Sequence, residues 1–190
     1  MNSEIILIGP IGSGKSTLAE LIYTRTLLPH RSMDLLRWKY FDEIGYDREV
    51  ARERYIREGI WGLYRYWKPF EAYTIRRVFE DFSRCIFDFG ASQSVYEDDG
   101  LFEQVRGILE PHPYVILLLP SPDREESIHI LHARNDHVSA ELWEVNEHFV
   151  DHHSNYDLAR YTAYTKDKTP EETCEEVLGW AKSRGWTFER

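Results

Sequence analysis

Residues 4–18 read EIILIGPIGSGKSTL, and they constrain the fold more than any other part of the chain. They begin with the apolar run 5–8, which is typical of a parallel strand buried on both faces. Residues 9–16 then match the phosphate-binding loop pattern G-x-x-x-x-G-K-[ST] at every fixed position. Because such a loop joins a strand to a helix, the stretch predicts an α/β protein with a parallel sheet.

The residue types in this loop suit the phosphate chain of a nucleotide. Glycines let the backbone close around phosphates, so that successive N–H groups and the N-terminus of the next helix point at the anion. Lys15 would reach the β- and γ-phosphates, and the Ser16 hydroxyl would ligate Mg²⁺. A glycine-rich turn without a ligand is the alternative. The loop residues expected to bind the nucleotide are Gly9, Ile11, Gly12, Ser13, Gly14, Lys15, Ser16 and Thr17.

Length, charge and cysteine content narrow the range of partners. A chain of 190 residues can form one α/β domain with an inserted segment. Its net charge of −10 disfavours nucleic acid, whose phosphates are bound by Lys and Arg. Cys85 and Cys174 lie in apolar patterns far apart, which favours reduced core thiols. With no signal peptide or membrane-spanning run in the sequence, we expect a cytoplasmic monomer or homodimer that binds neither nucleic acid nor membranes.

The spacing of apolar residues predicts strands that alternate with helices. Strands are expected over 5–8, weakly over 30–33, and over 85–88, 114–119 and 161–164. Helices are expected over 15–27, 101–109, about 123–134, 140–153 and after a capping box at 169–172. Ser121 and Pro122 are expected to supply the N-cap and first residue of the helix that ends near residue 134. This order predicts a three-layer α/β sandwich of the P-loop NTPase type.

The segment 35–84 is expected to be a helical insertion over the substrate side of the sheet. Two helices are predicted in it, one over 47–67 that Pro69 closes and one over about 71–82. Residues 37–84 carry 11 Lys or Arg against 9 Asp or Glu and hold 13 of the 27 aromatic residues. Such a segment suits an acceptor with negative charge or a ring, although a subdomain that packs its own aromatics would have the same composition.

The remaining segments complete one expected domain over 1–190. Its core is expected in 1–34, 85–134 and 154–190, and a short lid over about 135–153.

Two acidic residues follow predicted strands. Asp34 ends the weak strand, and Asp88 ends the strand 85–88. In a parallel sheet both would lie at the carboxyl edge, where α/β proteins bind ligands. An acid at the place of Asp88 commonly helps to hold Mg²⁺ beside a phosphate loop, so Asp88 and Ser16 are the expected metal ligands. Asp88 could equally hold an acceptor hydroxyl or cap the following turn.

Other classes of phosphate-loop protein find less support. A GTPase switch normally carries the guanine-reading segment N-K-x-D, which does not occur here. Residues 42–45 match D-x-x-G, but no strand is predicted before them. A motor or an AAA-type ATPase usually needs a longer core. The sequence therefore favours a kinase that passes the γ-phosphoryl group to a small molecule.

The sequence resembles the shikimate kinase branch of the small-molecule and nucleoside monophosphate kinases. The residues that carry the resemblance are 9–17, Asp34, 45–47, 70–76, 86–91, Arg134, 155–159 and 166–172. The resemblance implies an ATP- and Mg²⁺-dependent transfer to a hydroxyl or phosphate of a small molecule. It implies that Asp34 accepts the hydroxyl proton, that Lys15 stabilises the transferred phosphoryl group, and that Arg134 contacts the nucleotide. It also implies a nucleotide-binding role for Thr169, in the segment that borders adenine.

The sequence departs from this family where the acceptor would be recognised. Where the family has a triple glycine, this chain has Phe89-Gly90-Ala91, and where the family has a carboxylate-binding arginine, His152 and His153 stand. These departures leave the acceptor open. The residues expected to bind it are Asp34, Arg37, Arg76, Asp88 and Gly90, with the two arginines as forks for a carboxylate or phosphate. Because the expected lid has no second arginine, closure over the phosphates is expected from Arg134, Arg124 or His137.

A different interpretation is a nucleotide-binding regulatory or sensor protein with little transferase activity. The missing lid arginine favours it, and it predicts nucleotide binding without acceptor-dependent ADP production.

His148 and His152 are a separate feature of the sequence. They lie four residues apart on a predicted helix and could hold a transition metal. The sequence offers no third ligand at a firm spacing, and an ordinary polar helix face explains the pair as well.

Overall fold

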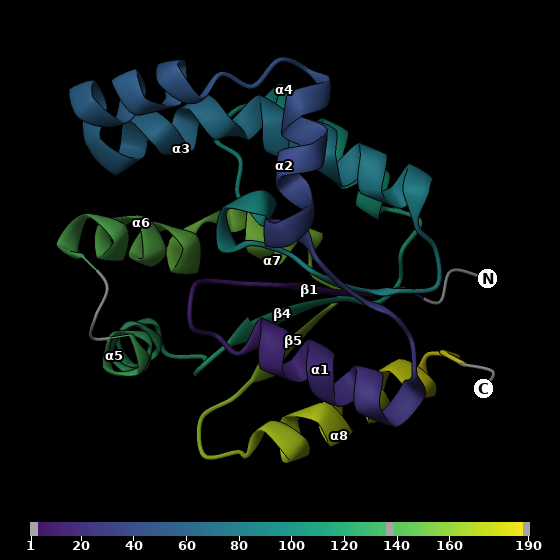
Figure 1. Ribbon diagram of the computed structural model, residues 1–190. Helices are drawn as coiled ribbons and strands as arrows, with labels where there is room; N and C mark the ends of the chain where they lie inside the picture. Colours follow the sequence, from purple (N-terminus) through teal and green to yellow (C-terminus); the bar gives the residue numbers. More distant parts are fainter. Residues whose placement is uncertain (1–3, 136–138, 188–190) are drawn as a thin grey trace.

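The computed structural model describes residues 4–135 and 139–187 (Figure 1). Within these ranges, five strands form one sheet in the order β2-β3-β1-β4-β5, and every neighbouring pair is parallel. The strands are β1 (Ile5–Ile8), β2 (His30–Ser32), β3 (Ile86–Asp88), β4 (Val115–Leu119) and β5 (Tyr161–Tyr164). Because the strands are parallel, all their carboxyl ends lie at one edge of the sheet.

Helices cover both faces of this sheet. They are α1 (Lys15–Thr26), α2 (Met33–Glu43), α3 (Arg48–Asp81), α4 (Asp99–Leu109), α5 (Arg124–Arg134), α6 (Ala140–Asp151), α7 (His153–Leu158) and α8 (Pro170–Ser183), with a 3-10 turn η1 (Ala91–Ser94). Figure 1 shows α1 and α8 below the sheet and α2, α3 and α4 above it. The predicted three-layer α/β sandwich with a parallel sheet is therefore confirmed.

The side chains of β1 alternate between the two cores. Ile5 and Leu7 pack with α1 and α8, whereas Ile6 and Ile8 pack with α3 and α4. All four are completely buried. Since both faces of the strand are covered, its sequence is a continuous apolar run.

The helical insertion differs from the prediction. Pro69 does not end a helix, because it lies inside α3, where Lys68, Phe70 and Glu71 are buried around it. The break falls instead at Gly59, whose φ of 63° and ψ of −157° are open to glycine and not to other residues. The second half of α3 packs on the sheet through residues such as Ile75 and Val78.

Three further features differ from the prediction: an additional helix, a different N-cap and a helix that is divided in two. The helix α2 was not expected, and Asp34 lies in its first turn. Asp123, not Ser121, caps α5 by accepting from the N–H of Glu126. The helix expected over 140–153 ends at Asp151, and α7 begins after His152, which caps it through Ser154 N–H.

The segment expected to be a lid is described only in part. Residues 136–138, with His137 among them, lie outside the described residues. From residue 140 the segment is the helix α6, whose Val145 and Phe149 pack with Tyr64 of α3 and Val95. Among the described residues, no helix is both long and apolar enough to cross a membrane.

A buried ion pair within α3 is hydrogen-bonded to η1. Lys68 Nζ lies 2.6 Å from Glu71 Oε2, and the two side chains are almost fully enclosed. Lys68 also donates to the carbonyl oxygens of Ser92 and Val95, at 2.5 and 3.0 Å. Glu71 in turn accepts from Ser92 Oγ at 2.5 Å. These bonds fix the segment that follows β3, which carries part of the candidate site.

We expect Glu71→Ala to destabilise the protein by about 3–5 kcal/mol, because it leaves the Lys68 ammonium buried without its partner. Glu80→Ala is the matched control, since Glu80 pairs with Arg77 on the exposed face of the same helix and should cost less than about 1 kcal/mol. Urea unfolding measures both. Equal losses for the two variants would contradict a dominant role for the buried pair.

Candidate active site

The phosphate-binding loop lies at the carboxyl end of β1, between β3 and β4. Gly9, Gly12 and Gly14 have φ values of 135°, 79° and 99°, the region that favours glycine. Gly9 has a further reason to be glycine, because a Cβ there would lie 2.5 Å from the backbone oxygen of Leu118. The loop is thus seated directly on the end of β4.

Lys15 is folded into the loop. Its Nζ donates to the backbone oxygens of Gly9 and Pro10, both at 2.9 Å. Burial lowers the pKa of Lys15 from 10.5 to about 8, while the negative charge of Asp88 opposes this shift. Ser13 Oγ is also buried here and has no hydrogen-bond partner among the described residues. The loop therefore holds a cation and an unpaired hydroxyl at the place where the sequence predicts phosphates.

A residue distant in the sequence holds the loop from outside. The side chain of Asn146, on α6, accepts from Ile11 N–H at 2.7 Å and donates to the Ile11 carbonyl oxygen at 3.2 Å. Asn146 is 1% exposed. Its amide thus satisfies both the N–H and the carbonyl oxygen of Ile11, as the backbone of a neighbouring strand would. No local sequence pattern indicates this contact, because the two residues are 135 positions apart.

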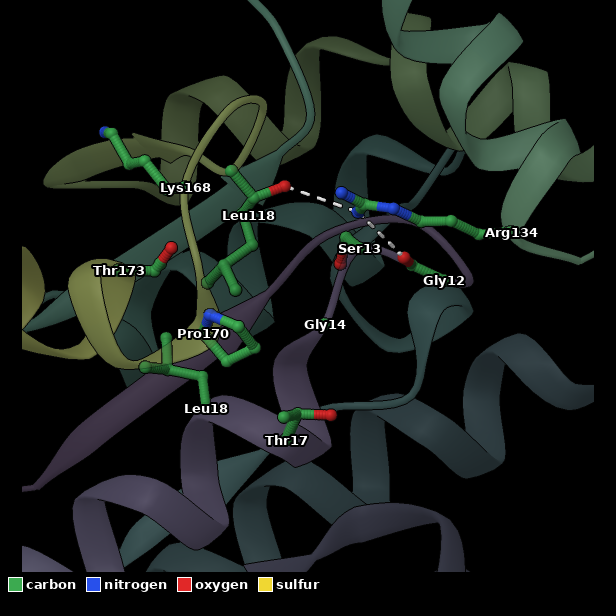
Figure 2. Close-up of a pocket in the computed structure, with 11 residues that line it drawn as sticks. Gly12, Ser13, Gly14, Thr17, Leu18, Leu118, Arg134, Lys168, Pro170 and Thr173 are labelled. Atoms are coloured by element: carbon green, nitrogen blue, oxygen red, sulfur yellow. Dashed lines mark hydrogen bonds between the residues drawn. The ribbon is translucent and has the colours of Figure 1, made fainter.

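A cavity of about 330 Å³ opens on one side of the loop (Figure 2). It is lined by Gly12, Ser13, Gly14, Thr17, Leu18, Leu118, Arg134, Thr165, Lys168, Pro170 and Thr173. Arg134 reaches from the end of α5 to the Gly12 carbonyl oxygen at 3.4 Å and Thr165 Oγ1 at 3.3 Å. The cavity thus joins the loop, Arg134 and the segment before α8.

Thr169 lies between Lys168 and Pro170, which line this cavity, but its own side chain caps a helix. It caps α8 by accepting from Glu172 N–H at 3.2 Å, while Glu172 accepts from Thr169 N–H at 2.7 Å. This confirms the predicted capping box. Lys168, which the sequence analysis did not single out, lines the cavity instead.

Asp88 lies at the tip of β3, beside the loop. It is 5% exposed and is in register with Leu7 of β1 and Ser32 of β2. Its Oδ2 lies 3.6 Å from His30 Nε2. Ser16 occupies the first turn of α1 and is exposed. A buried carboxylate beside the loop and an accessible hydroxyl are oxygen donors of the kind that Mg²⁺ takes, so these residues fit the predicted metal.

A second cavity, of about 150 Å³, lies on the other side of the loop. It is lined by Ile11, Asp34, Arg37, Ile60, Tyr64, Trp67, Ala91, Ser92, Leu142, Val145 and Phe149. Adjacent loop residues therefore face the two cavities, Gly12 the first and Ile11 the second. Most of the second lining is apolar or aromatic.

Asp34, Arg37 and Gly90 come together at this cavity. Asp34 and Arg37 form an ion pair one turn apart on α2. The Asp34 carboxylate rests against Gly90, where a Cβ would lie only 2.4 Å from its Oδ1. The expected acceptor residues that follow β2 and β3 are thus neighbours.

Among the described residues of the cavity wall, Arg37 is the cationic one. Its guanidinium stacks over the rings of Trp67 and Trp38, at 5.1 and 5.7 Å from their centroids. Burial lowers its pKa, and the charge of Glu71 counteracts this effect. Its Nε is buried and has no hydrogen-bond partner within the described chain. The cavity wall therefore includes a guanidinium group with one N–H left unbonded in the described chain.

Two other predicted arginines lie elsewhere. Arg76 is exposed, stacks 5.0 Å from the Tyr73 ring centroid, and is not among the described residues that line the cavity. Arg124 pairs with Asp151, at 2.6 Å from Nε to Oδ1. No sequence pattern indicates the apolar part of the wall, whereas the aromatic enrichment of 37–84 points to the part that Tyr64 and Trp67 supply.

Comparisons with known proteins support the same architecture. No protein-family model matches the chain, and no curated protein matches its sequence. Among solved structures, it is similar to shikimate kinase from Acinetobacter baumannii in complex with shikimate, with TM-score 0.67, 14% identity, and 98% and 97% of the two chains covered. It is also similar to shikimate kinase from Aquifex aeolicus, with TM-score 0.60, 16% identity, and 96% and 98% covered. A gluconokinase from Sinorhizobium meliloti gives TM-score 0.57, 17% identity, and 97% of both chains.

The fold is that of the P-loop small-molecule kinases, the group that the sequence predicted. At identities of 14–17%, the similarity establishes the fold.

We expect Asn146→Ala to weaken nucleotide binding by up to about tenfold, because the freed Ile11 backbone must be ordered again at the expense of binding energy. Asn155→Ala is the matched control. Asn155 is an equally buried amide, but it bonds to Ser94 and Phe149, away from the loop. Both variants should lose stability, and only Asn146→Ala should lose affinity in a titration with a fluorescent ATP analogue. Equal affinity losses would contradict the role of Asn146.

We expect the affinity for Mg·ATP to fall as the pH rises above 8. Bound phosphates favour the charged form of Lys15, whose pKa in the free protein is about 8, so each further pH unit weakens binding by up to about tenfold. Titrations between pH 7 and 9.5 at constant ionic strength measure this slope. Lys15→Ala should bind more weakly at pH 7 and show a flat profile. A wild-type affinity that is constant over this range would contradict the assignment.

Proposed function

We propose that the protein is a kinase that uses ATP and Mg²⁺ to phosphorylate a hydroxyl group of a small molecule. The observation that carries this proposal is the position of the phosphate-binding loop between two cavities. Gly12 faces the larger cavity and Ile11 the smaller one. ATP in the first and an acceptor in the second would meet at the loop, with Lys15 beneath them.

Asp34 is the proposed general base. It would take the proton of the acceptor hydroxyl while the hydroxyl oxygen forms a bond to the γ-phosphorus. The bond from the γ-phosphorus to the bridging oxygen breaks, and ADP leaves. The ion pair with Arg37 holds the Asp34 carboxylate at the wall of the second cavity. Lys15 and Arg134 would stabilise negative charge on the phosphates.

Ser16 and Asp88 are the proposed residues around Mg²⁺. Bound there, the ion would neutralise charge on the β- and γ-phosphates. Asp88 also keeps a negative charge near Lys15, which raises the pKa of that lysine against the effect of burial. This pairing preserves the ammonium that the phosphates need.

The wall of the second cavity narrows the acceptor class. Its described polar side-chain groups are Asp34, Arg37, Ser92, the Trp67 indole N–H and the Tyr64 hydroxyl. The last two already donate, to Tyr46 OH at 3.0 Å and to Glu97 at 2.7 Å. A polyol would leave several hydroxyls against apolar walls without hydrogen bonds, which is costly. We therefore propose an alcohol with a ring or another apolar body and one polar or anionic group for Arg37 Nε. In this proposal the insertion 35–84 and α6 form the acceptor site.

The experiment is ADP release from Mg·ATP in the presence of different acceptors. The panel contains shikimate, gluconate, nucleosides, nucleoside monophosphates, aminoglycoside-type alcohols and aryl alcohols that carry a carboxylate. At least one acceptor should stimulate ADP release, and the aryl alcohols should do so more than gluconate. If ATP binds and no acceptor stimulates its turnover, the alternative of a nucleotide-binding sensor is favoured.

We expect Asp34→Asn to lower the acceptor-stimulated rate by about 10²–10⁴-fold, because the general base is lost. Its affinity for ATP should change less than about twofold. Asp47→Asn is the matched control, since Asp47 is an exposed acid that caps α3, and asparagine is an equally good cap. Stimulated rates within twofold of each other for wild type and Asp34→Asn would contradict the proposed base.

A further inference from the structure

Three side chains with metal-binding donors meet behind the second cavity. Glu97 lies between η1 and α4, His148 in the last turn of α6, and His152 at the junction of α6 and α7. One donor atom of each lies within 4.8 Å of the others. His148 lies on the last turn of α6 and His152 is the extended residue that follows the helix, and their ring centroids are 5.0 Å apart. The third ligand that the sequence lacked is therefore brought in from a different part of the chain.

We propose that Glu97, His148 and His152 form a binding site for a divalent transition-metal ion such as Zn²⁺. Two imidazoles and one carboxylate are a donor set that suits Zn²⁺ and its neighbours, and with a water molecule they complete four-fold coordination. The inference is independent of the proposed kinase activity.

The distances require only small side-chain movements. Ligands at about 2.0–2.2 Å from a tetrahedral Zn²⁺ lie about 3.3 Å from one another. At present His148 Nε2 and Glu97 Oε1 are 2.6 Å apart, in a hydrogen bond. These side chains are 28% and 43% exposed, so they can separate to admit an ion from solvent.

The surroundings already orient the first two ligands. Tyr64 OH donates to Glu97 Oε1 at 2.7 Å, and the His148 ring packs edge-on against Trp61, with centroids 5.3 Å apart. Hydrogen bonds to a ligating carboxylate are the outer contacts that metal sites use. The positive charge of Lys68 favours the ionised form of Glu97. Lys68 is itself paired with Glu71, whose Oε2 lies 2.6 Å from Lys68 Nζ.

Metal binding exchanges existing hydrogen bonds for coordination bonds. His148 gives up the proton that it shares with Glu97. His152 Nδ1 now accepts from Ser154 N–H at 3.2 Å, the N-cap of α7. An imidazole that ligates through Nε2 carries its proton on Nδ1, so the ion would release this cap. His148 would ligate through Nε2 with its proton on Nδ1, and His152 would either change tautomer in the same way or ligate through Nδ1.

The test is Zn²⁺ titration of the full chain by calorimetry, after chelator treatment and without nucleotide, which would itself bind the metal. We expect saturable binding of one ion per chain. His148→Gln, His152→Gln and Glu97→Gln should each weaken it by about tenfold or more. His153→Gln is the matched control, because His153 is the next residue and pairs with Asp157 at 2.7 Å. It should change the affinity less than about twofold.

A second measurement keeps the outcome clear if a variant is unstable. Co²⁺ in place of Zn²⁺ should give the visible absorption of a low-coordinate site in the wild type and in His153→Gln, and not in His148→Gln. Circular dichroism and ATP-analogue binding check that each variant is folded. Absence of saturable Zn²⁺ binding to the wild type, or a loss in His153→Gln equal to that in His148→Gln, would overturn the proposal.

Discussion

The pairing of β1 between β3 and β4 is the interaction on which the rest of the structure depends. It buries four apolar side chains completely and divides them between two cores. It also fixes the phosphate-binding loop against Leu118 of β4 and beside Asp88 of β3. Because parallel strands bring their carboxyl ends to one edge, the loop, Asp34 and Asp88 meet there without any contact that is local in sequence.

The helix α6 links several features of this edge. Asn146 holds the loop, Val145 and Phe149 form the wall of the second cavity, and His148 reaches Glu97. These residues fall on more than one face of the helix, so α6 is in contact with the loop and with α3 at once. The helix α6 therefore contributes residues to both candidate binding sites.

The predicted fold was correct where consecutive residues carry the information. The run at 5–8, the loop motif, the strand over 161–164 and the capping box at Thr169 are local patterns, and each was found as expected. Pro69 was wrongly expected to end a helix, because burial on both sides of it outweighs the lost backbone hydrogen bond. The break at Gly59 was not predicted, because a single glycine in a helical pattern does not by itself indicate a turn.

Patterns of neighbouring residues are enough to specify the class of site: a phosphate loop after the first strand, Lys15 within it, and acids following β2 and β3. What surrounds these groups follows from the packing of separate elements. This packing placed Asp34 against Gly90, opened an apolar cavity beside Ile11, left Arg76 exposed on a different surface, and brought Asn146 to the loop. The difference lies in how far apart along the chain the interacting residues are. A backbone motif is specified by neighbours along the chain, whereas a cavity wall depends on which side chains of separate helices pack together.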